Sequence, residues 1–122
     1  MKNIKSKLII DKKGTKRWRL PNGKYHREDG PAIEYEDGFK SWYINGKLHR
    51  KNRPAVDSSN KKEYRIDGKL HREYGPAIIY SQAIADQWYY GQTIHWYLND
   101  KGFTEQEFKI KMRLKKLKFI LN

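Results

Sequence analysis

Three histidine–arginine pairs are the residues of this chain whose types and spacing could do chemistry. The pairs are His26-Arg27, His49-Arg50 and His71-Arg72, separated by 23 and then 22 residues. A shared metal ion would need imidazole nitrogens about 2 Å from it. Equivalent side chains on successive hairpins of a sheet instead lie about 10 Å apart. The spacing therefore argues against a common metal site.

Two other roles remain for these pairs. Each His or Arg can hold the adjacent turn through hydrogen bonds to carbonyl groups, or to acids such as Glu28, Asp29 or Glu73. Alternatively, the arginines form an exposed ladder that contacts an anionic partner. The first role is structural and the second is binding, and neither predicts catalysis.

The remaining polar residues do not form a catalytic pattern. His95 has no Ser, Cys or acidic residue at a spacing typical of a triad. The glycines mark hairpin turns and form no phosphate-binding loop. The chain contains no cysteine, which excludes a disulfide framework and Cys-based zinc sites. We therefore expect no catalytic residues, no metal and no cofactor.

The pairs belong to a longer motif that occurs three times. GKYHREDGPAIEY begins at Gly23, GKLHRKNRPAVDS at Gly46 and GKLHREYGPAIIY at Gly68. A fixed period of 20–50 residues indicates tandem copies of one supersecondary unit. Partial copies extend the pattern to residues 14–103, after a basic N-terminal stretch of residues 1–13. The chain length of 122 residues predicts a single domain.

Each unit reads as two or three short antiparallel strands. Residues 32–35 and 39–44 have strand character, and Asp37-Gly38 and Asn45-Gly46 are hairpin turn signals. We expect an all-β antiparallel hairpin meander in one sheet. Because Leu, Ile, Val and Phe number only 25, while Tyr and Trp number nine and four, we expect a shallow aromatic layer in place of a thick aliphatic core.

Two places break the pattern of the units. The middle copy has Asn52-Arg53-Pro54 where the others have Gly before Pro, and Arg does not adopt positive φ cheaply. About nine residues are inserted near residues 81–95, and we expect residues 87–90 to form a strand. An insert that departs from the rule of the other units is a candidate for contact with a partner.

The last segment changes character at Thr104. Thr104 and Glu107 form a capping-box pattern, which predicts a helix over about residues 105–120, although residues 108–114 also alternate as a strand would. Such a helix has two apolar stripes on opposite sides. Phe108, Met112 and Phe119 form one, and Ile110, Leu114, Leu117 and Leu121 form the other. One stripe can pack on the last unit, and the second needs a partner, a second copy of the chain or the end of the sheet.

The net charge of +13 is concentrated at the two ends of the chain. Residues 1–20 carry +7, residues 21–103 carry +2, and residues 104–122 carry +4. A basic patch can bind nucleic acid. The candidate residues for that role are Lys12, Lys13, Lys16, Arg17 and Arg19 at one end and Lys111, Arg113, Lys115, Lys116 and Lys118 at the other.

The motif resembles the MORN-like repeat proteins, in the W-Y-x-N-G-K-x-H-R-x-x-G-P-A variant of phages and large viruses. The resemblance covers residues 14–108 and extends to bacterial repeat proteins labelled as YwqK-type antitoxins. It implies a hairpin-repeat scaffold that binds a partner and has no catalytic residues. We expect a protein partner, with nucleic acid as the alternative and a homodimer through the helix also open. The candidate partner-binding residues are Trp88, Tyr89, Tyr90, Tyr43, Arg53 and Phe119.

The sequence also bears on location. The longest apolar run near the N-terminus, residues 8–10, is too short for a signal peptide or a membrane span. We therefore expect a cytoplasmic protein without membrane attachment, located in the host cytoplasm if a phage encodes it.

Overall fold

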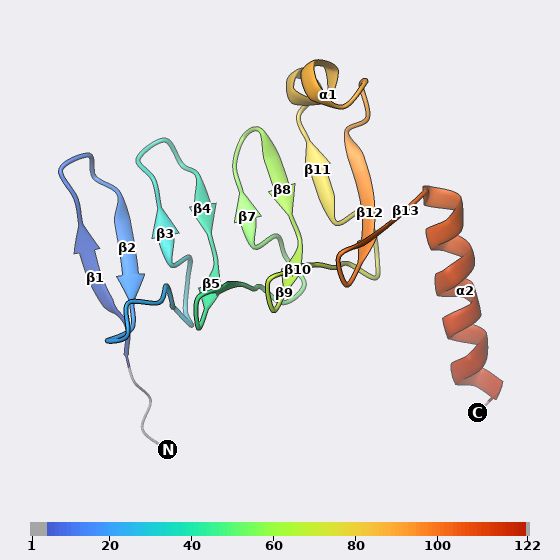
Figure 1. Ribbon diagram of the computed structural model, residues 1–122, viewed down its shortest axis with the longest axis horizontal. Helices are drawn as coiled ribbons and strands as arrows, with labels where there is room; N and C mark the ends of the chain where they lie inside the picture. Colours follow the sequence, from blue (N-terminus) through green and yellow to red (C-terminus); the bar gives the residue numbers. More distant parts are fainter. Residues whose placement is uncertain (1–4, 122) are drawn as a thin grey trace.

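A nine-stranded antiparallel sheet forms the body of the molecule (Figure 1). The computed structural model describes residues 5–121. The strands, in spatial order, are β1 (Lys7–Ile10), β2 (Lys16–Arg19), β3 (Ile33–Glu34), β4 (Lys40–Ser41), β7 (Val56–Asp57), β8 (Lys61–Glu63), β11 (Ile78–Tyr80), β12 (Ile94–Leu98) and β13 (Lys101–Phe103). The large antiparallel meander expected from the sequence is confirmed.

Two short ladders lie beside the sheet, along its lower side in Figure 1. β5 (Tyr43–Ile44) pairs with β6 (Lys47–Leu48), and β9 (Arg65–Ile66) pairs with β10 (Lys69–Leu70). In the β5–β6 turn, Asn45 and Gly46 have φ values of 50° and 80°. Positive φ at both central residues matches the right-handed twist of a tight hairpin, so the Asn-Gly signal correctly located this turn.

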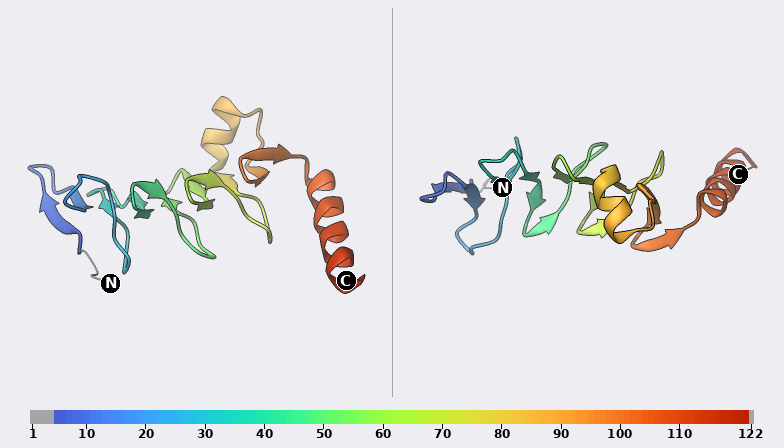
Figure 2. Two further views of the ribbon diagram at one scale, coloured as in Figure 1. Left: turned by 60° about the horizontal axis from the view of Figure 1, so that its bottom comes forward. Right: turned by 90° about the horizontal axis from the view of Figure 1, so that it is seen from above.

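The sheet is extended and forms a single layer (Figure 2), and its buried core is thin. Ala32, Ala55 and Ala77 are fully buried, and the next residue of each strand, Ile33, Val56 or Ile78, is nearly so. Among residues 5–121 no large side chain is completely buried, and the rings of Trp18, Trp42 and Tyr64 are half-buried. The core is therefore a row of small aliphatic residues beside a partly covered aromatic layer.

The N-terminal stretch contributes to the sheet. β1 lies within residues 1–13 and pairs with β2, with Leu8 opposite Trp18. The sheet thus begins before residue 14, where the sequence motif first becomes visible. Residues 1–4 of that stretch lie outside the described residues.

The insert folds as a helix, so the expectation of a strand over residues 87–90 was wrong. Helix α1 spans Gln82–Trp88, and the Ser81 hydroxyl accepts a hydrogen bond from the Ile84 amide at 3.4 Å. Ala85 is fully buried on its inner side. The serine cap and the burial of Ala85 outweigh the strand preference of the aromatic residues that follow.

Helix α2 spans Glu105–Leu121, which confirms the predicted C-terminal helix and excludes a strand over residues 108–114. The Glu107 amide donates to Thr104 Oγ1 at 3.1 Å, and the Thr104 amide donates to Glu107 Oε1 at 3.0 Å. This is the capping box seen in the sequence. The hydrogen bonds from Thr104 also lower the pKa of Glu107. Asn122, the last residue of the expected segment, lies outside the described residues.

Candidate functional site

The arginines of the three pairs each cover an aromatic ring. Their guanidinium carbons lie 3.8–3.9 Å from the ring centroids, and each Nη1 donates to a proline carbonyl at 3.1–3.2 Å. Arginine over an aromatic face is a stabilising cation–π contact. The sets are Arg27 with Trp18 and Pro31, Arg50 with Trp42 and Pro54, and Arg72 with Tyr64 and Pro76. These contacts support the structural role over the exposed ladder.

The histidines connect each unit to the next one. Nδ1 of His26 accepts a hydrogen bond from the Asn45 amide at 3.0 Å, and Nδ1 of His49 accepts one from Asp67 at 3.0 Å. Nδ1 of His71 does the same with the Asn99 amide at 3.1 Å. Acceptance at Nδ1 places the proton of a neutral imidazole on Nε2. Within residues 5–121, no three His, Asp or Glu side chains are grouped as metal ligands would be.

The glycine that precedes proline in the first and third copies leaves room for an arginine side chain. It is not required by its φ angle. A Cβ on Gly30 would lie 2.8 Å from Cζ of Arg27, and one on Gly75 would lie 2.9 Å from Cζ of Arg72. Neither glycine has positive φ. In the middle copy Asn52 adopts a φ of 63°, and Arg50 keeps its ring and carbonyl contacts although Arg53 replaces the glycine. That turn therefore differs in its backbone path.

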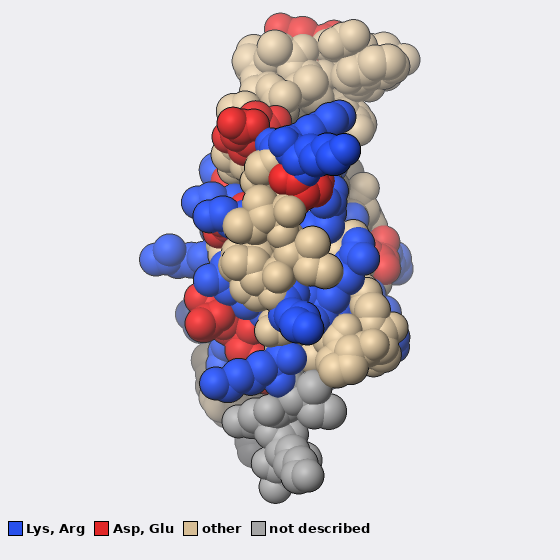
Figure 3. Space-filling view, turned by 90° about the vertical axis from the view of Figure 1, so that its left-hand side faces the viewer, with Lys and Arg blue, Asp and Glu red and all other residues tan. Residues whose placement is uncertain are grey.

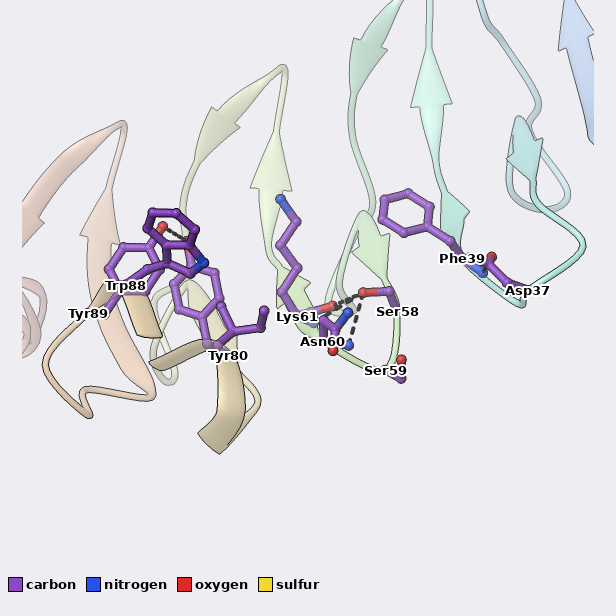
Figure 4. Close-up of a pocket in the computed structure, with 10 residues that line it drawn as sticks. Asp37, Phe39, Ser58, Ser59, Asn60, Lys61, Tyr80, Trp88 and Tyr89 are labelled. Atoms are coloured by element: carbon purple, nitrogen blue, oxygen red, sulfur yellow. Dashed lines mark hydrogen bonds between the residues drawn. The ribbon is translucent and has the colours of Figure 1, made fainter. Parts of the chain in front are cut away.

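An open pocket of about 450 Å³ lies between α1 and the turns of two neighbouring hairpins, β3–β4 and β7–β8 (Figure 4). Its apolar lining comes from Phe39, Tyr80, Ile84, Trp88 and Tyr89. Polar groups at its rim include Asp37, Ser58 and Asn60, which belong to the two turns. A concave aromatic surface with a polar rim is typical of a site that receives side chains of a partner.

Tyr80 and Tyr89 form a rigid wall of this pocket. Their rings stack with centroids 4.3 Å apart and an interplanar angle of 16°, and their hydroxyl oxygens lie 3.1 Å apart. The His95 ring meets both edge-on at 5.4 and 5.3 Å. Burial, together with the hydrogen bond to Tyr89, raises the pKa of Tyr80. The stacking and the hydrogen bond hold the two rings against each other.

Trp88, which lines the pocket, and Tyr90, which follows the lining residue Tyr89, both present large rings to solvent. Trp88 is 66% exposed and Tyr90 is fully exposed, with a positive φ of 52°. The turn at Tyr90 and Gly91 returns the chain to β12 and leaves the Tyr90 ring without cover. Exposed aromatic rings are the residues that most often carry binding energy at protein interfaces.

The structure brings together Trp88 and Tyr89 of the residues expected to bind a partner, with Tyr90 beside them. Tyr43 is half-buried, 5.3 Å from the ring of Tyr25, and burial raises its pKa. Arg53 is exposed in the turn of the middle copy, and Phe119 is 85% exposed on α2. Neither of these two lines the pocket.

Eight of the ten residues that line the pocket were not among the expected partner-binding residues, and Phe39 and Tyr80 are the aromatic ones. Both occupy ordinary positions of their hairpins, and the pocket brings them together with Ile84 and Trp88 of α1. Nothing in the local sequence signals that placement.

The two basic groups lie at opposite ends of the molecule and do not form one surface (Figure 1). Arg17 contacts Asp11 at 2.7 Å, and this hydrogen bond lowers the pKa of Asp11, while Arg19 donates to the Tyr25 hydroxyl at 2.9 Å. Seen from the β1 end, Lys and Arg are interspersed with acidic side chains around an uncharged patch (Figure 3). The five basic residues of the other group lie on α2, where Lys115 pairs with Glu73.

In the described part of the chain, neither helix has the length and apolar character needed to cross a membrane. Comparison with known proteins identified no relative, because no family model, curated protein or solved structure matches the chain.

Proposed function

We propose that this protein is a non-enzymatic, MORN-like repeat scaffold that binds a partner protein through the pocket at α1. The observation that carries this proposal is the exposure of Trp88 and Tyr90 beside a preformed aromatic pocket, at the one place where an insert interrupts the row of hairpins. The hairpins supply a rigid support, and α1 supplies the features specific to a partner.

The partner in this proposal is a host or toxin protein whose activity the scaffold inhibits. The resemblance of the sequence motif to phage, viral and antitoxin-like repeat proteins motivates this part. It fits a small accessory protein that works by occupying a surface, because the pocket offers aromatic contact area and turn polar groups and requires no chemistry.

The test is capture of proteins from host lysate by the purified chain, with and without nuclease, followed by mass spectrometry and affinity measurement on the captured protein. The paired substitution Trp88→Ala and Tyr90→Ala should weaken binding at least tenfold, since interface aromatic residues contribute about 2 kcal/mol each. Tyr74→Ala is the matched control, because Tyr74 is 90% exposed and does not line the pocket.

Two results would contradict this proposal. One is a captured protein whose affinity is the same for both variants, which would place its binding site elsewhere. The other is capture of nucleic acid alone, lost on nuclease treatment and decreasing steeply with salt, which would support binding through the basic ends.

A further inference from the structure

The second apolar stripe of α2 is only partly covered by the rest of the molecule. Ile110, Leu114, Leu117 and Leu121 follow one another at intervals of four, three and four residues, and are 50%, 59%, 47% and 82% exposed. This is the spacing by which one helix packs along another helix. We refer to these four residues as the leucine stripe.

The sheet holds α2 by other residues. Phe108 is the buried residue of the helix and packs on Trp96 with ring centroids 4.8 Å apart. Lys115 pairs with Glu73 at 2.5 Å. Phe119, on the same side as Phe108, is 85% exposed because the helix runs beyond the sheet. The docking of α2 therefore does not use the leucine stripe.

A groove of about 890 Å³ lies between α2 and the last hairpins, and the leucine stripe forms much of one wall. Leu114, Leu117 and Leu121 line the helix side, and Leu98 lies on the sheet side. An apolar groove beside a fixed helix is the geometry that receives an amphipathic helix. The groove is distinct from the α1 pocket, since the two share no lining residue.

The charges beside the stripe determine which helix fits. Lys111, Arg113 and Lys118 occupy positions that flank the leucine stripe, where residues of paired helices meet across the seam. In residues 5–121, none of these three has an ion pair. A second copy of α2 would place basic residues against basic residues, whereas acidic flanking residues would form ion pairs.

We propose that the leucine stripe of α2 binds an amphipathic helix of a partner protein whose apolar seam is flanked by acidic residues. The charge of the stripe's borders favours this occupant over a second copy of the chain. The inference stands apart from the α1 pocket, so failure of either binding surface leaves the other to be tested by its own variants.

The probe is a designed peptide of about three heptads with Leu at the seam and Glu at the flanking positions, labelled for fluorescence anisotropy. The protein should bind it with micromolar affinity, and the affinity should fall at least fivefold between about 50 and 300 mM salt. The same peptide with Lys in place of Glu should bind at least tenfold more weakly.

Two variants locate the site. Leu114→Gln with Leu117→Gln removes the seam, and Lys111→Glu with Lys118→Glu reverses the flanking charge; each should weaken binding at least tenfold. The controls are Phe119→Gln, on the other side of α2, and Lys12→Glu with Lys13→Glu, which changes the net charge equally at the far end. Circular dichroism must show that each variant keeps its helix.

Several outcomes would overturn the inference. These are no binding of the Glu peptide, equal loss of binding in the Lys12 and Lys13 control, or a dimer of the protein alone that disappears when the seam is removed. Binding of the wild-type chain to anionic vesicles in preference to the peptide would also overturn it, since the stripe would then be a membrane-binding surface.

Discussion

The ring of Phe108 lies 4.8 Å from the ring of Trp96, where the earlier units place an arginine over the equivalent aromatic residue. The first turn of α2 thus covers the last ring of the series. In this last unit an aromatic pair takes the place of the cation–π contact. The series of hairpin units ends here, because a helix follows instead of another proline turn.

Replacing Phe108 with Ala should release α2 from the sheet. Phe108 is 4% exposed, and a Phe→Ala change in a core costs about 3 kcal/mol or more. A helix of 17 residues without tertiary support is only marginally stable, so helical signal should also fall. Denaturant unfolding and circular dichroism measure both effects. Phe119→Ala is the control, and an equal loss in that variant would contradict the assignment.

Gly30→Ala should destabilise the protein by about 1–2 kcal/mol, because the new Cβ would displace the Arg27 guanidinium from Trp18. In an Arg27→Ala background the same change should cost much less, since there is no guanidinium to displace. A double-mutant cycle by denaturant unfolding isolates this coupling. Additive effects of the two substitutions would show that the glycine serves the backbone and not the arginine.

His49→Phe should destabilise the chain by about 1 kcal/mol, because the Asp67 amide would lose its acceptor. His49→Asn should recover part of that loss, since an amide oxygen can take the place of Nδ1. Hydrogen exchange should show faster exchange at the Asp67 amide in the Phe variant. Unchanged exchange there would mean that the hydrogen bond does not connect the two units.

Stability should fall in acid because of Glu63. Burial by itself would raise the pKa of Glu63, but the hydrogen bonds from Lys61 and Arg65 outweigh it and lower the pKa below the ordinary value of 4.5. A lowered folded-state pKa contributes stability above the unfolded-state pKa, and that contribution is lost as pH falls through the folded value.

Glu63→Gln should therefore cost about 2 kcal/mol near pH 7 and much less once the pH lies below the lowered pKa of Glu63, because the wild-type carboxyl group is then protonated and has lost its ion pairs as well. Urea unfolding across pH 2–7 measures the difference. Glu36→Gln, at an exposed position, should leave the pH profile unchanged. A Glu63→Gln curve parallel to wild type at every pH would contradict the role of the buried carboxylate.

Much of the fold follows from short-range signals in the sequence. The Asn45-Gly46 turn depends on φ values at two adjacent residues, and the start of α2 depends on hydrogen bonds between Thr104 and Glu107. Such signals act within a few residues, so they can be read without the rest of the chain. The insert shows their limit, because Trp88 and Tyr89 favour a strand in isolation while the Ser81 cap and buried Ala85 produce a helix.

The amino-acid sequence by itself determined the tandem motif, its tight turns and the capped terminal helix. The tertiary structure alone decided which ring each arginine covers, which turn each histidine reaches, and that Phe39 and Tyr80 face α1. Those contacts join residues from different hairpins, such as His26 and Asn45, 19 positions apart. Their geometry depends on strand register and on where the insert lies above the sheet, and neither is encoded in the spacing of neighbouring residues.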